Sequence, residues 1–298
     1  MFRRASIGAS KASGLDIVLI STTDMRGGRV DVRERMLNSL VESQGTLGDN
    51  RLVLSMLLQN CAAENVSPSA LRLPPFVRRL DTSGRVPLST ARNMLLRQLN
   101  TDGTVSPDAL VAFPDDDCWY PSGLLSQVAE LFARDETLDF WFCRYASNPI
   151  SVAAAPPARA SIGQIVRNAS SNTMFLRGRV VTAIGEFDEA LGIGTPMGGS
   201  EDIDYALRAQ RVARKTLYCD AALVGHRDKS SKVRANYYPS SLVVLARHAR
   251  HGAMKEFLRK IAVGVYLVSR RELGFANFVA ALRRAIRVFG MQRRPQPG

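Results

Sequence analysis

The chain has 298 residues, of which 46% are hydrophobic, with a mean hydropathy of −0.07 and a formal net charge of +13. These values are those of a globular protein long enough to bury a full core, as one large domain or as one domain with an appendage. The four cysteines form no C-x-x-C pair and no framework spacing, which excludes a disulfide scaffold and indicates reduced thiols of a cytosolic protein.

The N-terminal segment 1–14 contains basic residues but no apolar core, so it does not resemble a signal peptide and is expected to be a disordered leader. Elsewhere, no apolar run approaches the ~20 residues that a membrane span requires.

Apolar runs predict strands over residues 15–20, 51–58 and 76–80, with a helix over residues 31–44 between the first two. A strand, a helix and a second strand within about fifty residues form a parallel βαβ unit. The loop after the first strand lacks a G-x-G-x-x-G pattern, so a dinucleotide-binding fingerprint is absent.

A helix is expected shortly after Val86, with Ser89 or Thr90 as its N-cap. Arg92 would then lie in the first turns, close to where a helix N-terminus binds an anion. An ordinary surface arginine is the alternative interpretation.

A short buried strand over residues 109–113 ends abruptly in Asp115, Asp116 and Asp117. Three adjacent carboxylates repel one another and are costly to bury, whereas a cation such as Mg²⁺ or Mn²⁺ accepts such hard oxygen ligands. In an open α/β sheet, ligands collect at the carboxyl ends of strands, where this cluster would lie. A solvated acidic turn is the alternative.

The second half continues with a helix over residues 124–132, strands over 140–145 and 172–177, and a short helix over 179–184. The intervening residues 146–168 are expected to form a mobile loop, and loops of this length often cover active sites.

A glycine-rich segment then precedes Glu201 and Asp202 at the start of a helix, for which Ser200 is the expected N-cap. Acidic residues at this position also favour the helix dipole, so simple capping is an alternative to a catalytic role. The last predicted strand, 216–224, ends near His226. A lone histidine there is usually a polar end residue, but beside a carboxylate cluster it becomes a candidate metal ligand.

The net charge is concentrated in the C-terminal quarter. Residues 227–298 hold 16 of the 40 Lys and Arg residues but 3 of the 27 acids, so they carry the whole excess of +13. At ~100° per residue, four apolar side chains of the last predicted helix fall within about 80° of one another, with three arginines roughly opposite. The apolar residues are Phe278, Leu282, Ile286 and Phe289, and the arginines are Arg283, Arg284 and Arg287.

This pattern predicts a basic amphipathic helical tail over residues 237–298, which would dock on an anionic membrane surface. The alternative is that the helices pack on the preceding domain and their arginines are merely solvated.

Several motifs in order, "LSTARN", "FPDDDCWY", "IGEFDEALGIGT", "GGSEDIDYALR" and "VGH", together resemble family 2 glycosyltransferases of the GT-A fold. The resemblance covers residues 15–228. It implies an α/β catalytic domain, 15–236, with a Rossmann-like mixed central sheet flanked by helices. It also implies metal-dependent transfer of a sugar from a nucleotide-sugar donor, of UDP type, to a hydroxyl of a glycan or lipid-linked glycan, as in polysaccharide biosynthesis.

In that family the acidic triplet holds the divalent metal and the donor diphosphate, and the aspartate of the Glu-Asp pair is the catalytic base. Carried over, Asp202 is the base, and Asp117 and His226 are ligands of Mn²⁺ or Mg²⁺. One metal and one base predict a single in-line displacement, hence inversion. The remaining residues expected to bind substrate are Thr22, Thr23, Asn60, Arg92, Asp115, Asp116 and Glu201.

This sequence departs from the family pattern at two places. The usual acidic residue after the second strand is replaced by Gln59 and Asn60, and the first loop is extended over residues 26–29.

Two other classes of function remain as alternatives. A nucleotidyltransferase would carry a glycine-rich phosphate loop after the first strand, of which Gly27-Gly28 is a poor version. A nucleic-acid-binding protein would explain the basic tail, but no aromatic stacking platform accompanies it. The sequence therefore favours a cytoplasmic glycosyltransferase, peripheral at the inner face of a membrane, without a specific nucleic-acid partner.

Overall fold

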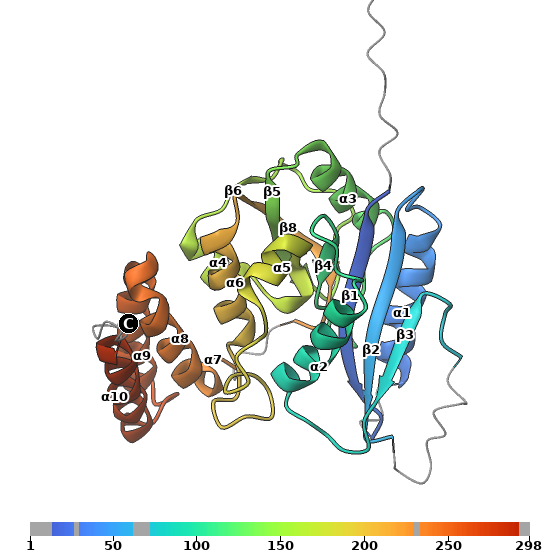
Figure 1. Ribbon diagram of the computed structural model, residues 1–298. Coiled ribbons are helices and arrows are strands. Elements are labelled where there is room, and N and C mark those ends of the chain that lie inside the picture. Colours follow the sequence, from blue (N-terminus) through green and yellow to red (C-terminus); the bar gives the residue numbers. More distant parts are fainter. Residues whose placement is uncertain (1–13, 27–29, 62–71, 229–232, 292–298) are drawn as a thin grey trace, which may run out of the picture.

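The computed structural model describes residues 14–26, 30–61, 72–228 and 233–291, so nearly all of the predicted leader lies outside the described residues. The described strands form one sheet in the order β3-β2-β1-β4-β7-β5-β8-β6 (Figure 1). Their bounds are Asp16–Asp24 (β1), Arg51–Gln59 (β2), Val77–Asp81 (β3), Leu110–Ala112 (β4), Leu138–Ala146 (β5), Ala158–Arg159 (β6), Met174–Arg177 (β7) and Lys215–Gly225 (β8).

The sheet is mixed, as predicted. Strands β3, β2, β1 and β4 are parallel neighbours, whereas β7 lies antiparallel between β4 and β5. Because β7 is antiparallel to both β4 and β5, β5 runs in the same direction as β4, and β8 is parallel to β5. The carboxyl ends of β1, β2, β4, β5 and β8 therefore all lie at one edge of the sheet. That edge positions the candidate site.

The helices cover both faces of the sheet. Their bounds are Val30–Gln44 (α1), Leu88–Thr101 (α2), Leu124–Arg134 (α3), Ile162–Asn168 (α4), Gly178–Ile184 (α5), Glu201–Val212 (α6), Val233–Asn236 (α7), Tyr238–His248 (α8), Met254–Ser269 (α9) and Phe275–Met291 (α10). Short 3-10 helices span Ser171–Thr173 and Ala249–His251. Residues 146–168, which were expected to form a mobile loop, therefore contain β6 and α4. Helix α4 begins with a capping box between Ser161 and Gln164.

Two apolar clusters sandwich the sheet because successive strand residues point to opposite faces. In β1, Ile17 and Leu19 pack toward α1 and α3, whereas Val18 and Ile20 pack toward α2 and α6. All four side chains are fully buried. Burial on both faces explains why the strands have continuous rather than alternating apolar sequences.

Neither predicted cap has a side chain that caps its helix. Helix α2 begins at Leu88, preceded by Pro87, and the Ser89 hydroxyl instead donates to the carbonyl of Leu191 (2.7 Å). Ser200 does occupy the N-cap position of α6, as predicted, but it has a φ of 69° and its side chain makes no capping hydrogen bond. Its hydroxyl lies 3.0 Å from those of Ser240 and Ser241 on α8, so a tertiary contact replaces the local one.

The C-terminal helices pack on the α6 side of the sheet as a group (Figure 1). Apolar residues of α8 are buried, and α9 and α10 pack against α8. The buried side chains that α9 and α10 add to the same cluster as the sheet are Phe257, Leu267, Phe278, Ala281 and Ala285. No helix among the described residues is both long enough and apolar enough to cross a membrane.

A buried charge cluster joins α6 to α8. Asp204 of α6 accepts hydrogen bonds from Arg208 (2.9 Å) and Arg247 (3.1 Å), and its Oδ1 lies 2.9 Å from His248 Nε2. Burial raises the pKa of Asp204, but His248 and the two arginines together lower it to about 2. Because Asp204 is two residues from Asp202, this cluster holds the helix that carries the predicted base.

Replacing Asp204 with Ala should lower the free energy of unfolding by about 3 kcal/mol, because the buried His248 and the partly buried Arg208 lose their carboxylate partner. The contribution of Asp204 is present above its unfolded pKa of 3.8 and is lost as the pH falls toward 2. The difference in melting temperature between the wild type and Asp204→Ala should therefore shrink below pH 4. Glu130→Ala, which removes an exposed pair with Arg134, is the control and should cost less than ~1 kcal/mol. Equal losses in the two variants would contradict a stabilising role for the cluster.

Candidate active site

The three aspartates after β4 point into different environments. Asp115 accepts hydrogen bonds from Arg92 (3.0 Å) and Asn172 (2.9 Å), and Asp116 accepts one from Thr23 at the end of β1 (2.7 Å). Asp117 is ion-paired with Arg227. Each carboxylate is therefore oriented by a partner that lies far away in the sequence.

A metal-binding geometry is present at the carboxyl edge of β4 and β8. One ligand atom each from Asp115, Asp117 and His226 lies within 4.8 Å of the others. His226 Nε2 is 3.1 Å from Asp117 Oδ1 and 3.8 Å from Asp115 Oδ2. The side chains of Asp117 and His226 are more than nine-tenths buried.

The orientation of His226 fits a role as a metal ligand. Its Nδ1 lies 3.0 Å from the carbonyl oxygen of Arg227. A carbonyl can only accept, so this contact requires the proton on Nδ1 and leaves Nε2 facing two carboxylates. Beside two carboxylates, Nε2 needs either a proton or a metal ion on its lone pair, and a divalent cation would satisfy the nitrogen and both carboxylates at once. Metal-bound histidines are commonly held in this way, with the second ring nitrogen donating to a carbonyl.

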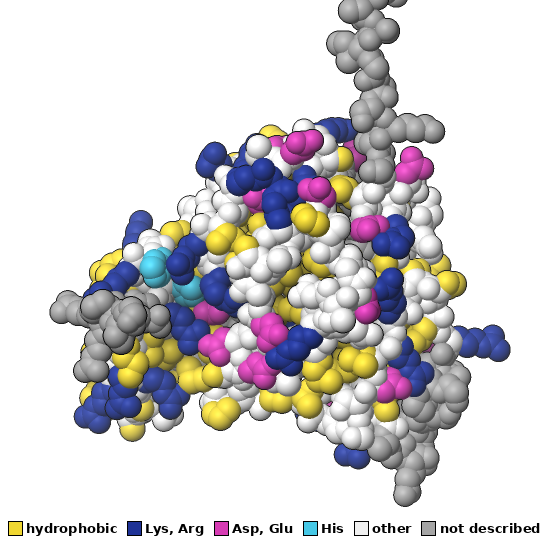
Figure 2. Space-filling view, in the orientation of Figure 1, with side chains coloured by type: hydrophobic (Ala, Val, Ile, Leu, Met, Phe, Trp, Pro, Cys, Tyr) yellow, Lys and Arg dark blue, Asp and Glu magenta, His cyan; other side chains and the backbone are white. Residues whose placement is uncertain are grey.

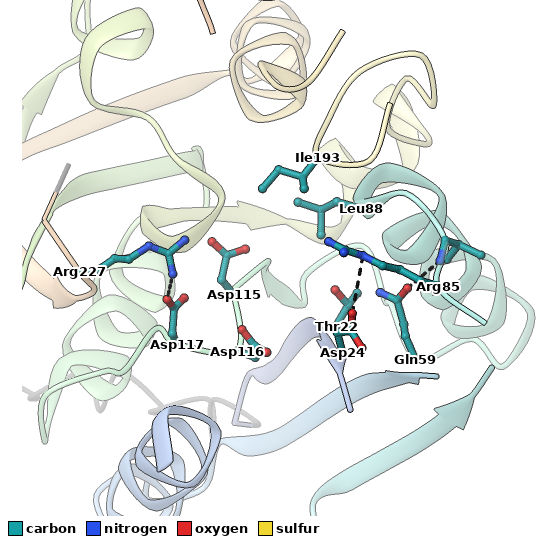
Figure 3. Close-up of a pocket in the computed structure, with 11 residues that line it drawn as sticks. Thr22, Asp24, Gln59, Arg85, Leu88, Asp115, Asp116, Asp117, Ile193 and Arg227 are labelled. Carbon is teal, nitrogen blue, oxygen red and sulfur yellow. Dashed lines mark hydrogen bonds and ion pairs between the residues drawn. The ribbon is translucent and has the colours of Figure 1, made fainter. Parts of the chain in front are cut away.

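A cleft opens beside this cluster. It is lined by the end of β1, by the triplet, by Arg85 and Leu88 before and within α2, and by Ile193 of the glycine-rich segment (Figure 3). Arg227 closes one side of it, and Gln59 and Asp24 lie at the other. The cleft thus combines a carboxylate cluster with two arginines, a suitable pairing for a metal-bound phosphate ligand.

Arg92 lies beneath the cleft rather than on the surface. Its side chain is 1% exposed, and Nη1 lies 3.7 Å from Glu201 Oε1 while Nη2 bonds to Asp115. Burial and the neighbouring Asp202 raise the pKa of Glu201 to about 7, against the lowering effect of Arg92. Arg92 therefore connects the acidic triplet to the start of α6.

Asp202 lies on the more open side of that helix start and is half-buried. Two tyrosines lie near Asp202, and the ring of Tyr145 also packs edge-on against that of His226, with centroids 4.9 Å apart. Burial raises the pKa of Tyr145 to about 12, and the negative charges of Asp202, Asp115 and Asp117 add to this shift. Tyr237 likewise has its pKa raised by burial and by Glu201 and Asp202. Asp202 and the triplet are therefore both close enough to Tyr145 to affect its pKa.

The other predicted residues have more varied positions. Thr22 lines the cleft, whereas Thr23 is buried and supports Asp116. Asn60 has a φ of 60° and donates to Asp24 Oδ1 (2.6 Å), so it orients a neighbour, and Gln59 is the residue of this pair that lines the cleft.

Several residues of the site were not predicted from the sequence: Asp24, Arg85, Tyr145, Asn172, Arg227 and Tyr237. Their signals were weak, although Asp24 ends a strand at the same edge as the triplet and Arg227 directly follows His226. The acid that the family places after the second strand is absent, but Asp24 brings a carboxylate to Asn60 from β1.

No protein-family model matches the sequence, and a comparison with curated proteins gives no match. Solved structures do match. Residues 1–349 of S. aureus TarS, a GT-A glycosyltransferase, align with a TM-score of 0.63 at 15% identity over 93% of this chain and 82% of that one. The same fragment in complex with UDP-GlcNAc gives a TM-score of 0.61 at 15% identity, over 92% and 81% of the two chains.

This chain has the GT-A fold. The chain spans 43% of the longer TarS chain, which it matches with a TM-score of 0.58 at 15% identity over 83% of its own length. The alignment with the 1–349 fragment covers 93% of this chain, which is more than residues 1–236 make up of its 298 residues. The alignment therefore includes part of the C-terminal helices of this chain. The fold likeness is thus longer than the segment 15–228 that the sequence motifs indicate.

Proposed function

We propose that this GT-A chain is an inverting glycosyltransferase that uses a divalent metal, Mn²⁺ or Mg²⁺, and a UDP-type nucleotide-sugar donor. The observation that carries the proposal is the placement of Asp115, Asp117 and His226 at the carboxyl edge of the sheet, beside a cleft with arginines on its walls. A binding fold seen with UDP-GlcNAc in TarS supports the choice of donor class.

The donor end of the cleft is suited to a diphosphate. A divalent cation held by Asp117, His226 and Asp115 would neutralise the charge that develops on the leaving group. Arg227 and Arg85 add fixed positive charge on the cleft walls. Thr22, Asp24 and Gln59 supply polar groups at the far end of the same cleft, which we assign to the nucleoside. Asp116, held by Thr23, faces the ribose or the sugar.

The acceptor end is assigned to the start of α6. Asp202 is assigned to take the proton from the attacking hydroxyl, because it lies on the more open side of the helix start and near Tyr145, which also neighbours the triplet. Glu201 is buried against Arg92 and is assigned to donor binding. A hydroxyl that attacks from the side opposite the diphosphate gives inversion at the anomeric carbon.

We assign the acceptor as a hydroxyl of a glycan or lipid-linked glycan, in a reaction of polysaccharide type. Tyr145 and Tyr237 lie near Asp202, and their rings suit the apolar faces of a sugar. Gly199 allows Tyr237 to approach the glycine-rich segment, since a Cβ at that position would lie 2.5 Å from its ring.

A panel of nucleotide-sugars tests the proposal. With Mn²⁺ present, at least one UDP-sugar should raise the melting temperature and release UDP when saccharide acceptors are added, whereas the same mixture with EDTA should do neither. Nucleotidyl transfer would release pyrophosphate instead. If no nucleotide-sugar alters the melting temperature with metal present, the assignment of this cleft as a donor site is wrong.

A further inference from the structure

An exposed face on the C-terminal helices has a composition unlike the rest of the surface. Eight of the fourteen large hydrophobic residues that the described structure leaves exposed lie on α9 and α10. We define the α9–α10 face by its most exposed apolar residues and by the basic residues beside them: Leu258, Val265, Tyr266, Phe275 and Ile286, with Lys255, Arg259, Arg283 and Arg287.

The apolar residues of this face are separate from the apolar residues that α9 and α10 bury in the core. Helix α10 buries Phe278, Ala281 and Ala285 against the rest of the protein, while Phe275 is 70% exposed and Ile286 is 57% exposed. Helix α9 likewise buries Phe257 and Leu267, while Leu258 and Tyr266 are each 58% exposed. Each helix thus has an inner apolar stripe that packs and a second apolar set that does not.

Basic residues alternate with the exposed apolar ones. Lys255 and Arg259 lie one turn apart on α9, and Arg283 and Arg287 lie one turn apart on α10, all exposed. The sequences of α9 and α10 contain a single acid, Glu256, which is buried. Figure 2 shows dark blue and yellow side chains interleaved over these helices, at the lower left of the molecule.

We propose that the α9–α10 face docks on an anionic lipid bilayer. Positive side chains are attracted to acidic headgroups, and exposed aliphatic and aromatic side chains between them can enter the interface. A nucleic acid would also meet the charge, but five exposed apolar residues add little to contacts with phosphates. The combination of both kinds of side chain on one face is what favours lipid.

Helix α10, which carries part of this face, also contacts the glycine-rich segment before α6. The glycine-rich segment before α6 and the C-terminal helices lie toward the same lower side of Figure 1. They also touch, since Arg284 Nη1 lies 2.9 Å from Met197 Sδ. Arg284 therefore contacts the segment that leads to Asp202, whereas Arg283 and Arg287 are the arginines of α10 that we assign to contacts with the membrane. The inference does not depend on the proposed sugar transfer, because binding to vesicles is measured without substrate.

Co-sedimentation of the full chain with lipid vesicles tests the proposal. The protein should bind vesicles of phosphatidylcholine with phosphatidylglycerol, bind pure phosphatidylcholine weakly, and be released by salt. Arg283→Glu with Arg287→Glu should reduce the bound fraction by at least about tenfold. Phe275→Ser with Ile286→Ser should also weaken binding, since it removes the apolar contribution while keeping the buried stripe.

Matched controls separate docking from other effects. Arg134→Glu with Arg159→Glu changes charge equally at exposed sites on α3 and β6, and it should bind vesicles as the wild type does. Wild-type melting temperatures in all variants would show that the fold is intact. The proposal is overturned if the wild type does not bind acidic vesicles, if Arg283→Glu with Arg287→Glu binds as well as the wild type, or if the face proves to join two copies of the chain. Equally tight binding to duplex DNA, lost in the same variants, would also assign the face to another partner.

Discussion

Replacing Asp202 with Asn should lower the rate of sugar transfer by about 10²-fold or more, the usual scale on which a general base is lost. Asparagine keeps the shape of the side chain at the start of α6 but cannot accept the proton of the attacking hydroxyl. In the proposed function the donor is bound by the triplet and the arginines of the cleft, whose lining does not include Asp202, so its affinity should be unchanged. Calorimetry with the donor and initial rates with an acceptor would separate these two effects.

Glu201→Gln is the matched comparison for Asp202→Asn. The pKa of Glu201, about 7, lies near the value that suits a general base at neutral pH. Its side chain, however, is buried and lies 3.7 Å from Arg92 Nη1. Its loss should therefore weaken donor binding more than the turnover number. If Asp202→Asn retains near-wild-type turnover while Glu201→Gln loses it, the role of base belongs to Glu201.

The carboxyl edge of the sheet explains why part of the site could be predicted. The runs before Asp115 and before His226 are apolar enough to be buried strands, and parallel strands bring their carboxyl ends to one edge. Asp115, Asp117 and His226 therefore meet within 4.8 Å although up to 111 positions separate them in the chain. Strand order itself was not deducible, because the apolar runs do not say which neighbours pair.

Side chains on the cleft walls could not be predicted in the same way. Arg85 and Arg227 lie in irregular segments, where no hydrophobic period fixes the direction of a side chain. The position of Ser200 at the N-cap of α6 could be predicted, but the partner of its hydroxyl could not, because local capping and the tertiary contact with Ser240 compete for it and only the packing of α8 decides between them. For α10, the helical pattern groups Phe278 and Ile286 on one apolar face, whereas the structure buries Phe278 in the core and leaves Ile286 exposed, outside the narrow stripe that α10 buries.

Replacing Asp117 with Asn should lower the affinity for Mn²⁺, and with it the metal-dependent affinity for the nucleotide-sugar, by about 10²-fold or more. Changes to residues that merely orient a metal ligand already cost 10–100-fold in affinity, so the loss of a direct carboxylate ligand should cost at least as much. Asp117 is the strongest candidate because its carboxylate is buried and approaches His226 Nε2 to 3.1 Å. Calorimetric titration of Mn²⁺ alone, then of the donor with and without Mn²⁺, measures both affinities.

A carboxylate outside the cleft serves as the control for Asp117→Asn. Asp220 lies on β8 and pairs with Arg144 at the surface, where its side chain is 73% exposed. Asp220→Asn makes the same chemical change and should bind Mn²⁺ and the donor as the wild type does. His226→Gln should reproduce the loss seen in Asp117→Asn, since the two side chains are assigned to the same ion. Unchanged Mn²⁺ affinity in both Asp117→Asn and His226→Gln would mean that the carboxyl edge of β4 and β8 does not hold the metal, and that the arginines of the cleft bind the diphosphate without it.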